Sequence, residues 1–485
     1  MKVLFASSEV VPFAKTGGLA DVSGALPVNL NSSGCDVRVI TPFYRMTLKS
    51  DLQRNLLIDN IEVQVGDRTY FGQVWEGLLK SSVPLYLVRC DEFFDRDQLY
   101  GTPQRDYHDN AERFIFFCRI AFETCTKLGF SPDIIHCNDW QTGLIPAYIK
   151  SIYKDNPFFS STATVFTVHN VAYQGLFKKE KFNLTGLPSY FFDINGLEYW
   201  GKMSLMKSAL IYSDVINTVS KKYSQEIQTE EYGYGLERVL LSRKDDLYGI
   251  LNGVDYEEWN PLQDRFISKH YSVKNLLGKK ACKKDLLNEY KLPSDMIDTP
   301  LVGSISRLTD QKGFDLLAEV MDELMELDLG FVLLGTGEQK YHELFTCIGK
   351  KYQGKAGIMI AYDNRIAHKI EAGCDMFLMP SQYEPCGLNQ IYSLKYGTVP
   401  IVRATGGLDD TIQDYDMNTG KGTGFKFKEY LPEEFLNSIK RALSLYKDKK
   451  RWKNLIKNCM ACDFSWEKSA QEYIELYKTA RAKRA

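Results

Sequence analysis

The sequence has almost no net charge, no long apolar run and no framework of paired cysteines. Its 60 Lys and Arg residues nearly balance 62 Asp and Glu, which leaves a formal net charge of −2. No broad basic field is therefore available to bind nucleic acid or an anionic membrane. No apolar run reaches the roughly 18 residues that a bilayer span requires. We expect neither nucleic acid nor a membrane as a partner.

The 11 cysteines are odd in number and scattered along the chain, unlike the regular spacing of a small disulfide-rich domain. They predict reduced thiols in a cytoplasmic protein. Cys459 and Cys462 form a C-x-x-C pair, but no second pair or histidine follows at ligand spacing, so we expect no zinc site. The apolar start at residues 1–6 is too short for a signal peptide and predicts a first strand.

Short β-branched runs alternate with amphipathic stretches along the whole chain. Alternation of this kind predicts an α/β fold with parallel sheets, and the strands are too many for one doubly wound sheet. The predicted strands are Lys2–Ala6, Val37–Thr41, Pro84–Val88, Asp133–His136, Thr164–Val168, Asp214–Thr218, Leu301–Ser304, Gly330–Leu334, Gly357–Ile360, Asp375–Met379 and Val399–Val402. We expect two such domains, joined within residues 253–274 and packed face to face across a cleft.

The pattern T-G-G-L-x-D occurs twice, at residues 16–21 and 405–410. Each copy follows a predicted strand and opens a predicted helix. Glycine pairs at such a join let the backbone approach a ligand, and helix N-termini offer N–H groups to an anion. The alternative for each copy is a tight turn with no ligand.

Three cations lie near predicted strand ends: Lys15 beside the first glycine pair, and Arg307 and Lys312 in "SISRLTDQKG". Together they could bind a diphosphate, because Arg binds phosphate bidentately and Lys acts as a point charge. The alternative is that they are solvated surface charges.

Four further residues follow predicted strands. Glu384 could stabilise positive charge at a reacting carbon, or it could be a solvated carboxylate. His169 could act in a cleft, or it could be a core histidine. Asp139 beside Trp140 could bind a sugar by hydrogen bonds and stacking, or the pair could be a loop charge next to a core aromatic.

Six stretches together resemble the bacterial glycogen synthases and plant starch synthases. They are "SSEVVPFAKTGGLADVSGALP", "HNVAYQG", "NGVD", "SRLTDQKG", "EPCGLNQ" and "ATGGLDD", in family order between Ser7 and Asp410. The resemblance implies a GT-B fold with two Rossmann-like domains. Residues 1–253 would bind the acceptor glucan and residues 254–460 the sugar nucleotide, while the helix in residues 461–485 would cross back to the first domain.

The resemblance also implies transfer of glucose from ADP-glucose to the non-reducing end of an α-1,4-glucan, with retention, release of ADP, and no metal or other cofactor. The implied catalytic residues are Lys15, His169, Arg307, Lys312 and Glu384. The implied donor-binding residues further include Gly17, Gly18, Asp21, Asn252, Tyr362, Cys386, Gly387, Thr405, Gly406 and Gly407. Asp139 and Trp140 would bind the acceptor.

The sequence departs from the wider family pattern at two places. Many retaining GT-B enzymes have a second glutamate eight positions after the first, where this chain has Tyr392. The acceptor stretch H-x-H-D-W-H-A-G is here "HCNDWQTG", so that Asn138 and Gln141 replace two histidines. The first departure leaves the ribose contact unassigned, and the second bears on acceptor affinity.

One alternative function stays open, and three others are disfavoured by the sequence. A related GT-B enzyme could use UDP-glucose, because phosphate motifs do not distinguish the bases. A phosphorylase would need a cofactor-lysine motif, which we do not find. A nicotinamide-dependent dehydrogenase would need G-x-G-x-x-G after a strand, and the run at Gly335 lacks the third glycine. A two-lobed sugar-binding protein would not need cations from both lobes.

Overall fold

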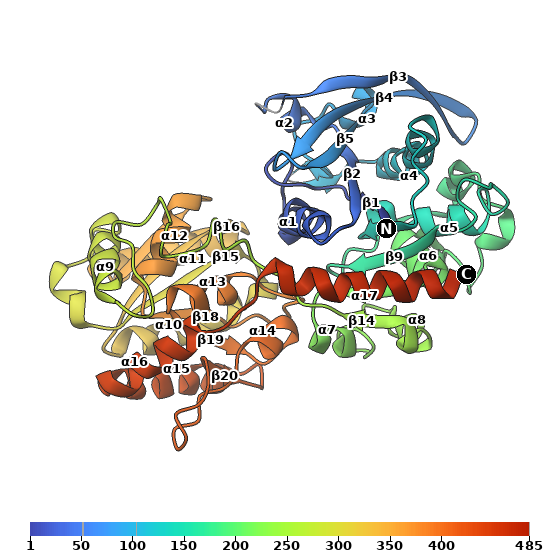
Figure 1. The fold of residues 1–485 in the computed structure, drawn as a ribbon. Coiled ribbons are helices and arrows are strands. Elements are labelled where there is room, and N and C mark those ends of the chain that lie inside the picture. The colour runs from blue at the N-terminus through green and yellow to red at the C-terminus, as the bar shows by residue number, and fades with distance from the viewer. Residues whose placement is uncertain (51–52, 103, 485) are drawn as a thin grey trace. The chain divides into compact units, whose positions relative to one another are not determined.

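The computed structural model describes residues 1–50, 53–102 and 104–484. The chain folds into two compact units: residues 1–253 with 466–485, and residues 254–465. Figure 1 shows a central sheet with helices around it in each unit. The strands of both sheets are mostly parallel and buried in hydrophobic cores. The predicted α/β class with doubly wound sheets is confirmed.

The sheet of the first unit has the order β14-β13-β9-β8-β1-β2-β5-β4-β3. All neighbours up to β5 are parallel, and β4 and β3 are added antiparallel at one edge. Its strands are β1 Lys2–Ala6, β2 Asp36–Pro42, β3 Asn55–Val65, β4 Arg68–Leu79, β5 Val83–Arg89, β8 Ile134–Asn138, β9 Ala163–Val168, β13 Val215–Thr218 and β14 Leu247–Gly249. Two small sheets comprise β10 Leu176–Lys178, β11 Glu198–Tyr199 and β12 Lys202–Ser204, and β6 Gly101–Thr102 with β7 Arg105–Asp106.

The helices of the first unit lie mostly between these strands. They are α1 Gly18–Ser32, α2 Arg45–Leu48, α3 Asp91–Phe94, α4 Asn110–Lys127, α5 Ile145–Lys150, α6 Leu205–Tyr212, α7 Lys221–Glu226, α8 Glu237–Ser242 and α17 Trp466–Arg484, with 3-10 turns η1 Trp140–Thr142, η2 Lys179–Thr185, η3 Ser189–Phe191 and η4 Lys244–Asp246. Helix α4 buries phenylalanines along its length.

The second unit has a six-stranded parallel sheet in the order β17-β16-β15-β18-β19-β20. Its strands are β15 Leu301–Leu308, β16 Gly330–Gly337, β17 Ala356–Ile360, β18 Met376–Met379, β19 Val399–Arg403 and β20 Phe425–Phe427. Its helices are α9 Leu277–Glu289, α10 Phe314–Glu326, α11 Gln339–Lys351, α12 Asn364–Gly373, α13 Asn389–Tyr396, α14 Gly406–Thr411, α15 Pro432–Lys447 and α16 Lys449–Met460, with 3-10 turns η5 Ser294–Asp298 and η6 Asp310–Lys312.

The C-terminal helix α17 packs on the first unit, against α1 and the sheet (Figure 1). Under it, the Tyr477 hydroxyl hydrogen-bonds His136 Nδ1 at 2.7 Å, and Asn217 donates to the Tyr473 hydroxyl at 2.9 Å. These groups are fully buried or nearly so. Because a buried polar group must find its partner, this layer fixes the position of the helix on the sheet.

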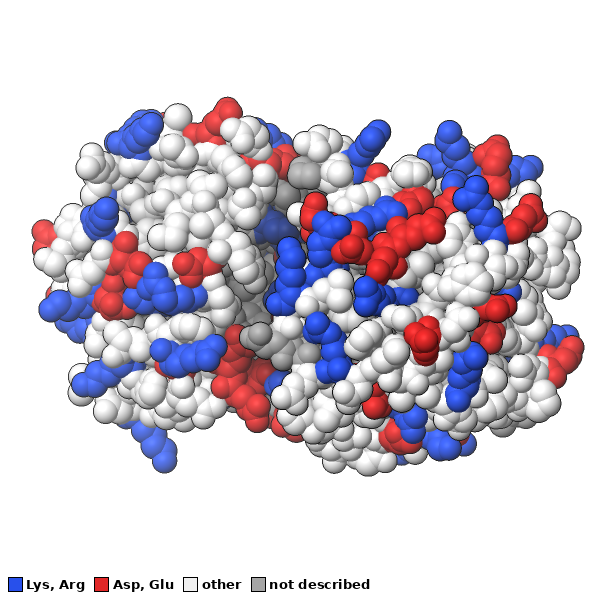
Figure 2. All heavy atoms as spheres, turned by 90° about the horizontal axis from the view of Figure 1, so that it is seen from above, with Lys and Arg blue, Asp and Glu red and all other residues white. Residues whose placement is uncertain are grey.

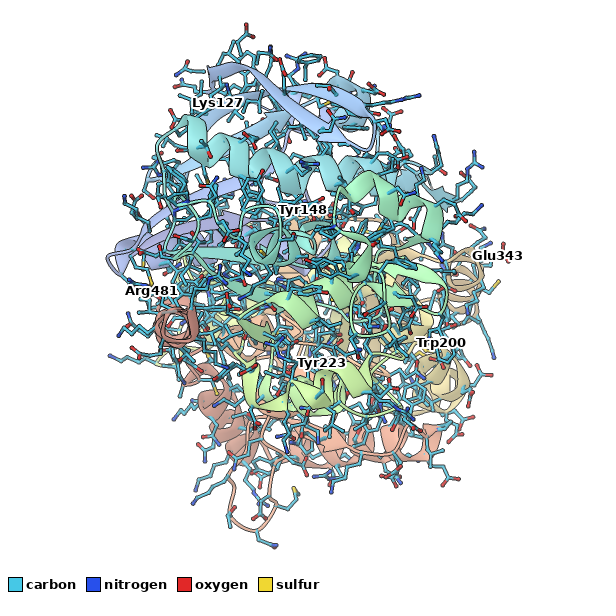
Figure 3. The ribbon with its side chains drawn as sticks, turned by 90° about the vertical axis from the view of Figure 1, so that its right-hand side faces the viewer. Lys127, Tyr148, Trp200, Tyr223, Glu343 and Arg481 are labelled. Atoms are coloured by element: carbon cyan, nitrogen blue, oxygen red, sulfur yellow. The ribbon has the colours of Figure 1, made fainter. Side chains whose placement is uncertain are left out.

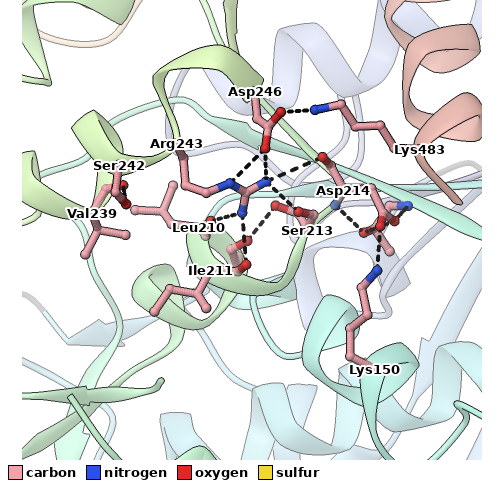
Figure 4. A network of polar contacts seen from close by, with 12 residues as sticks. Lys150, Leu210, Ile211, Ser213, Asp214, Val239, Ser242, Arg243, Asp246 and Lys483 are labelled. Carbon is pink, nitrogen blue, oxygen red and sulfur yellow. Dashed lines mark hydrogen bonds and ion pairs between the residues drawn. The ribbon is translucent and has the colours of Figure 1, made fainter. Parts of the chain in front are cut away.

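The end of α17 meets a second polar network, drawn in Figure 4. The Arg243 guanidinium donates to the carbonyls of Leu210 and Ile211 in the last turn of α6, at 2.7 and 2.9 Å. It also contacts Asp246, which pairs with Lys483 of α17. A cation at the C-terminal carbonyls of a helix satisfies orphan acceptors and complements the helix dipole.

Acidic and basic side chains are interspersed over the face seen in Figure 2. Among the residues that the structure describes, no helix combines the length and the apolar character needed to cross a bilayer.

Candidate functional site

In each unit the strand order reverses beside the first strand: between β1 and β8 in the first unit, and between β15 and β18 in the second. Ligands of doubly wound sheets bind beyond the carboxyl ends of the strands at this switch point. Lys15 and Asp139 follow β1 and β8, whereas Lys312 and Glu384 follow β15 and β18. The topology thus brings predicted site residues to the switch point of each sheet.

In the second unit, Lys312 and Glu384 form an ion pair across the switch point. Lys312 Nζ lies 2.6 Å from Glu384 Oε2, with side chains 17% and 6% exposed. The Ser381 hydroxyl donates to the same oxygen at 3.1 Å. A buried carboxylate needs such partners because desolvation penalises an unpaired charge. The pair holds a cation and an anion within reach of one bound molecule.

The backbone that delivers Lys312 requires a glycine. Gly313 ends η6 at a φ of +76°, and a Cβ atom there would lie 2.1 Å from the carbonyl oxygen of Pro380. Pro380 directly follows β18. The loops after β15 and β18 therefore pack tightly against each other, which holds Lys312 beside Glu384.

Arg307 differs from Lys312. It lies near the end of β15 with its side chain exposed. Its guanidinium has neither a hydrogen bond nor an ion pair with the part of the chain that the structure describes. The guanidinium fork is therefore available for an anion.

The second T-G-G-L-x-D loop packs against the loop that carries Glu384. The Gly407 amide donates to the Glu384 carbonyl at 3.0 Å. A Cβ at Gly406, whose φ is +45°, would lie 1.9 Å from that carbonyl oxygen, and one at Gly407 would lie 2.1 Å from the Cys386 carbonyl oxygen. These glycines are thus required by the fold itself. The phosphate contact predicted for Thr405, Gly406 and Gly407 stays a prediction.

Residues after Glu384 complete this packed loop. The Cys386 side chain is 5% exposed, and Gly387 has a φ of +71°. Gln390 of α13 donates to the carbonyls of both, at 2.9 and 3.0 Å. The loop from Glu384 to Gly387 is therefore held by its own unit, and the sugar contacts predicted for Cys386 and Gly387 remain predictions.

In the first unit, a buried glutamate organises the loop before α1. Glu9 Oε2 accepts from the amides of Thr16 and Gly17 at 2.6 and 3.2 Å, and Oε1 accepts from the Thr16 hydroxyl at 2.5 Å. Glu9 itself is 4% exposed. The Glu9 carboxylate thus occupies two amides of the first T-G-G-L-x-D loop. The sequence had suggested that amides of this loop bind an anionic ligand.

Next to this clamp, Gly17 and Gly18 face open space. A Cβ atom at either position would meet no atom within 4 Å, and Gly17 has an extended φ of −153°. Neither glycine is therefore demanded by internal packing. Lys15 Nζ lies 2.7 Å from Asp21 Oδ1, with side chains 40% and 28% exposed. Asp21 thus holds Lys15 at the edge of the open loop.

A chain of hydrogen bonds runs from this loop into the core. The Tyr100 hydroxyl donates to Glu9 Oε1 at 2.8 Å, and the Asn110 amide donates to the Tyr100 carbonyl at 2.8 Å. Fully buried Arg113 donates to Asn110 Oδ1 at 2.6 Å. Sequence reasoning missed all four residues. The position of Glu9, three residues after a predicted strand, could have indicated a role at the site. Tyr100, Asn110 and Arg113 act through tertiary contacts, which the sequence does not show.

At the end of β8, Asp139 adopts a φ of +55° and a ψ of 179°, a conformation that costs a non-glycine residue about 1–3 kcal/mol. The strained backbone brings its carboxylate to the His169 amide, 2.8 Å away. Burial raises the pKa of Asp139 to about 7, and the charge of Glu9 adds to the rise. A carboxylate whose pKa lies near neutrality at a switch point is typical of a functional site.

His169 lies at the end of β9, beside Asp139. Its Nε2 lies 3.0 Å from Asn138 Oδ1, and Asn138 Nδ2 donates to the Ala6 carbonyl. Since Asn138 Oδ1 can only accept, Nε2 of His169 carries the proton. Burial lowers the pKa of His169 to about 3, so the ring is neutral. Asn138 thus orients His169. Asn138 stands at one of the two positions where the family pattern has a histidine and this chain does not.

Three other predicted residues lie elsewhere. The Trp140 ring packs edge-on against Phe114 at 4.9 Å, and a Cβ at Gly175 would lie 2.5 Å from it, which makes it part of the aromatic core. Tyr362, after β17, is 78% exposed. Asn252 is 5% exposed, and its Oδ1 has no hydrogen-bond partner among the described residues. The ligand contacts proposed for these three residues stay predictions.

Tyr392, which stands where many GT-B enzymes have a second glutamate, is a packing residue. Its ring stacks on Trp259 with centroids 3.9 Å apart, and Trp259 stacks in turn on His368 at 3.7 Å. The side chain of Tyr392 is 8% exposed.

Comparison with known proteins agrees with this arrangement. A model of the starch synthase catalytic domain matches residues 2–242, and a model of group 1 glycosyl transferases matches residues 295–458. A glycogen synthase from Koribacter versatilis is 50% identical over 485 residues, which is 100% of this chain and 99% of that protein. The chain belongs to the glycogen synthase and starch synthase family.

Solved structures give the fold of this synthase-family protein. The catalytic domain of starch synthase IV from Arabidopsis thaliana, bound to ADP and acarbose, superposes with a TM-score of 0.92 at 33% identity, covering 99% of both chains. Sucrose-phosphate synthase from Thermosynechococcus elongatus superposes with a TM-score of 0.61 at 17% identity, covering 99% of this chain and 98% of that one, and shows the fold alone. The protein is a GT-B glycosyltransferase, and its family and fold predictions are confirmed.

Proposed function

We propose that this protein transfers glucose from ADP-glucose to the non-reducing end of an α-1,4-glucan, with retention at the anomeric carbon. The observation that carries the proposal is the largely buried Lys312–Glu384 pair at the switch point of the second sheet, together with the exposed Arg307 near the end of β15. Two comparisons favour ADP-glucose and a glucan as the substrates. Proteins named glycogen synthase match the whole chain, and the matching starch synthase structure contains ADP.

In the proposed reaction the bond between the glucosyl C1 and the diphosphate oxygen breaks. The acceptor O4 forms a new bond to C1 on the same face, and its proton passes to the leaving diphosphate, which departs as ADP. Arg307 and Lys312 would bind the diphosphate as its negative charge grows, which stabilises the transition state more than the ground state. Glu384 would stabilise positive charge at C1.

Residues of the first unit would assist. Lys15 would add a third cation to the donor phosphates, with Gly17 and Gly18 allowing close approach of the backbone. Neutral His169, with its proton on Nε2, would hydrogen-bond the transferred glucose, and Asp139 would bind hydroxyls of the acceptor. We propose that these side chains provide the charge stabilisation without a metal, so transfer should persist in the presence of a chelator.

Exposed Tyr362 would stack on the nucleobase. Stacking accepts either base, so UDP-glucose remains the alternative donor. We also propose a reducing, cytoplasmic location, because the 11 cysteines are scattered along the sequence without disulfide-like spacing.

The test supplies ADP-glucose and UDP-glucose separately, with glycogen, and measures both nucleoside diphosphate release and chain extension. We expect extension with ADP-glucose and much slower extension with UDP-glucose. Preference for UDP-glucose would establish the alternative, and no release from either donor would refute the proposed reaction.

A further inference from the structure

The hairpin β11–β12 in the first unit has an unusual turn. Its two linking residues, Trp200 and Gly201, have φ values of +50° and +76°, the backbone of a type I′ turn. Asn, Asp and Gly favour the first position of such a turn, whereas a bulky side chain there is an outlier. Of the six non-glycine residues with positive φ in the described chain, only Trp200 and Tyr234 are aromatic.

Burial does not explain the indole at this position. Trp200 is 85% exposed and lies at the periphery in Figure 3. It therefore contributes little to the hydrophobic core, while its backbone conformation works against it. Tyr190 and Ile194, which precede the hairpin in the chain, are also exposed, at 67% and 76%. An exposed aromatic residue held in an unfavourable backbone conformation points to a function outside the fold.

The turn is nevertheless firmly built. Glu198 Oε1 accepts from the Gly201 amide at 2.7 Å. Buried Lys207 donates through Nζ to the carbonyls of Ile194 and Glu198, at 2.7 and 2.5 Å. The Tyr199 hydroxyl donates to the Tyr234 carbonyl at 2.8 Å. These bonds hold the backbone of the hairpin in one conformation, so no ordering of the turn is needed when a ligand meets the indole.

The hairpin is also connected to the candidate site. Strand β10 follows shortly after His169 in the chain and pairs with β12, with Leu176 opposite Ser204. Gln174, between His169 and β10, donates to the same Tyr234 carbonyl as Tyr199 does, at 2.8 Å. The segment after the predicted catalytic histidine is therefore tied directly to the base of the Trp200 turn.

We propose that Trp200 is a stacking platform for the α-glucan acceptor, at a distance from the reacting end. This inference rests on the proposed function, which supplies a polymeric sugar as the substrate. A sugar ring offers a face of C–H groups to an aromatic ring and hydroxyls to neighbouring polar groups. A long glucan spans several sites, whereas a short one reaches only the reacting centre, so the platform favours polymeric acceptors.

Trp200→Asn is the decisive variant, because asparagine suits the left-handed turn better than tryptophan. Its melting temperature should equal or exceed that of the wild type. In native gels containing glycogen, the affinity should fall about three- to tenfold, the range of one aromatic contact. The KM for glycogen should rise by a similar factor, while kinetics with maltotriose stay within about twofold of wild type.

Two further variants serve as controls. Trp200→Phe keeps a ring and should retain most of the glycogen affinity. Phe71→Ala removes a 58% exposed aromatic from β4 of the same unit and should change neither glycogen affinity nor kinetics.

Unchanged glycogen affinity in Trp200→Asn would overturn the platform, and so would a lowered melting temperature, which would assign the indole a packing role. A change of sedimentation from one oligomeric state to another, with unchanged glycogen affinity, would show that the surface binds a second copy instead. If the wild type transferred no glucose but Trp200→Asn still weakened glycogen binding, the platform would stand and the proposed reaction would fall.

Discussion

The two T-G-G-L-x-D loops have the same sequence pattern and opposite surroundings. In the first loop, a Cβ atom at Gly17 or Gly18 would meet nothing, and Glu9 already binds the amides of Thr16 and Gly17. In the second, Gly406 and Gly407 leave no room for a Cβ atom. The first pair of glycines leaves space for a ligand, whereas the second pair lets two loops of the chain touch.

The ion pairs near the two loops also differ in their exposure to solvent. Lys15–Asp21 is partly exposed at 40% and 28%, and Lys312–Glu384 is largely buried at 17% and 6%. Exposed pairs contribute about 0–1 kcal/mol to stability, while breaking a buried pair costs about 3–5 kcal/mol. A repeated motif or charge pair therefore does not imply a repeated role.

The largest effects are expected in the second unit. Arg307→Ala and Lys312→Ala should each lower turnover by about 10²–10³-fold, the usual cost of one group that stabilises developing charge. Only Lys312→Ala should also lower the melting temperature, because it leaves Glu384 buried and unpaired. Steady-state kinetics and thermal melting separate the two outcomes, and the double variant Lys312→Ala/Glu384→Gln should recover part of the lost stability. Near-normal transfer by both single variants would contradict the diphosphate assignment.

Lys15→Ala should reduce kcat/KM for the donor by about 10-fold or more, because a cation is lost from the proposed phosphate site. Its stability should change by about 1 kcal/mol or less, since its partner Asp21 remains partly solvated. Comparing denaturant unfolding of Lys15→Ala with that of Lys312→Ala tests the contrast between the two pairs. Equal destabilisation by both substitutions would show that their burial does not distinguish them.

Asp139→Asn should show a smaller, pH-dependent effect on stability. The folded-state pKa of about 7 lies above the roughly 3.9 of an unfolded aspartate, so the wild type loses stability as the pH rises between these two values. Asparagine does not titrate. The melting temperature of the variant minus that of the wild type should therefore increase from about pH 4 to pH 7 and stay constant above pH 7.

A melting-temperature difference between Asp139→Asn and wild type that stayed constant across this range would show that the carboxyl is not desolvated as described. As a matched control, Asp36→Asn neutralises an exposed aspartate at the start of β2 and leaves the carboxyl of Asp139 in place.

Much of the fold could be predicted because parallel strands that are buried on both faces have continuous apolar sequences. Strand β1 has the predicted bounds Lys2–Ala6, and β19 differs from its prediction by one residue. The two antiparallel strands at one side of the first sheet, β3 and β4, were missed. Residues of β3 are largely exposed up to Asn60, and an antiparallel strand with one solvated face lacks a continuous apolar run.

The candidate site was predictable where chemistry follows a strand directly, as for Lys312 and Glu384. It was not predictable where a role depends on packing. Glu9 acts through the amides that it binds, and Arg113 acts through Asn110 and Tyr100. Trp140 shows the opposite case. Its position next to a carboxylate suggested a sugar-binding residue, but its ring packs in the aromatic core against Phe114.

The most direct test of the contrast between the loops changes the same motif position in each, with Gly18→Ala and Gly407→Ala. Both glycines are helical and lack positive φ, so alanine is favoured locally at both. Thermal melting and glucose transfer should be measured together. Gly18→Ala should melt at or above the wild-type temperature yet transfer poorly, because its methyl group enters the ligand's space. Gly407→Ala should lose about 1–3 kcal/mol of stability through the clash with Cys386. Wild-type transfer by Gly18→Ala, or wild-type melting of Gly407→Ala, would contradict the account.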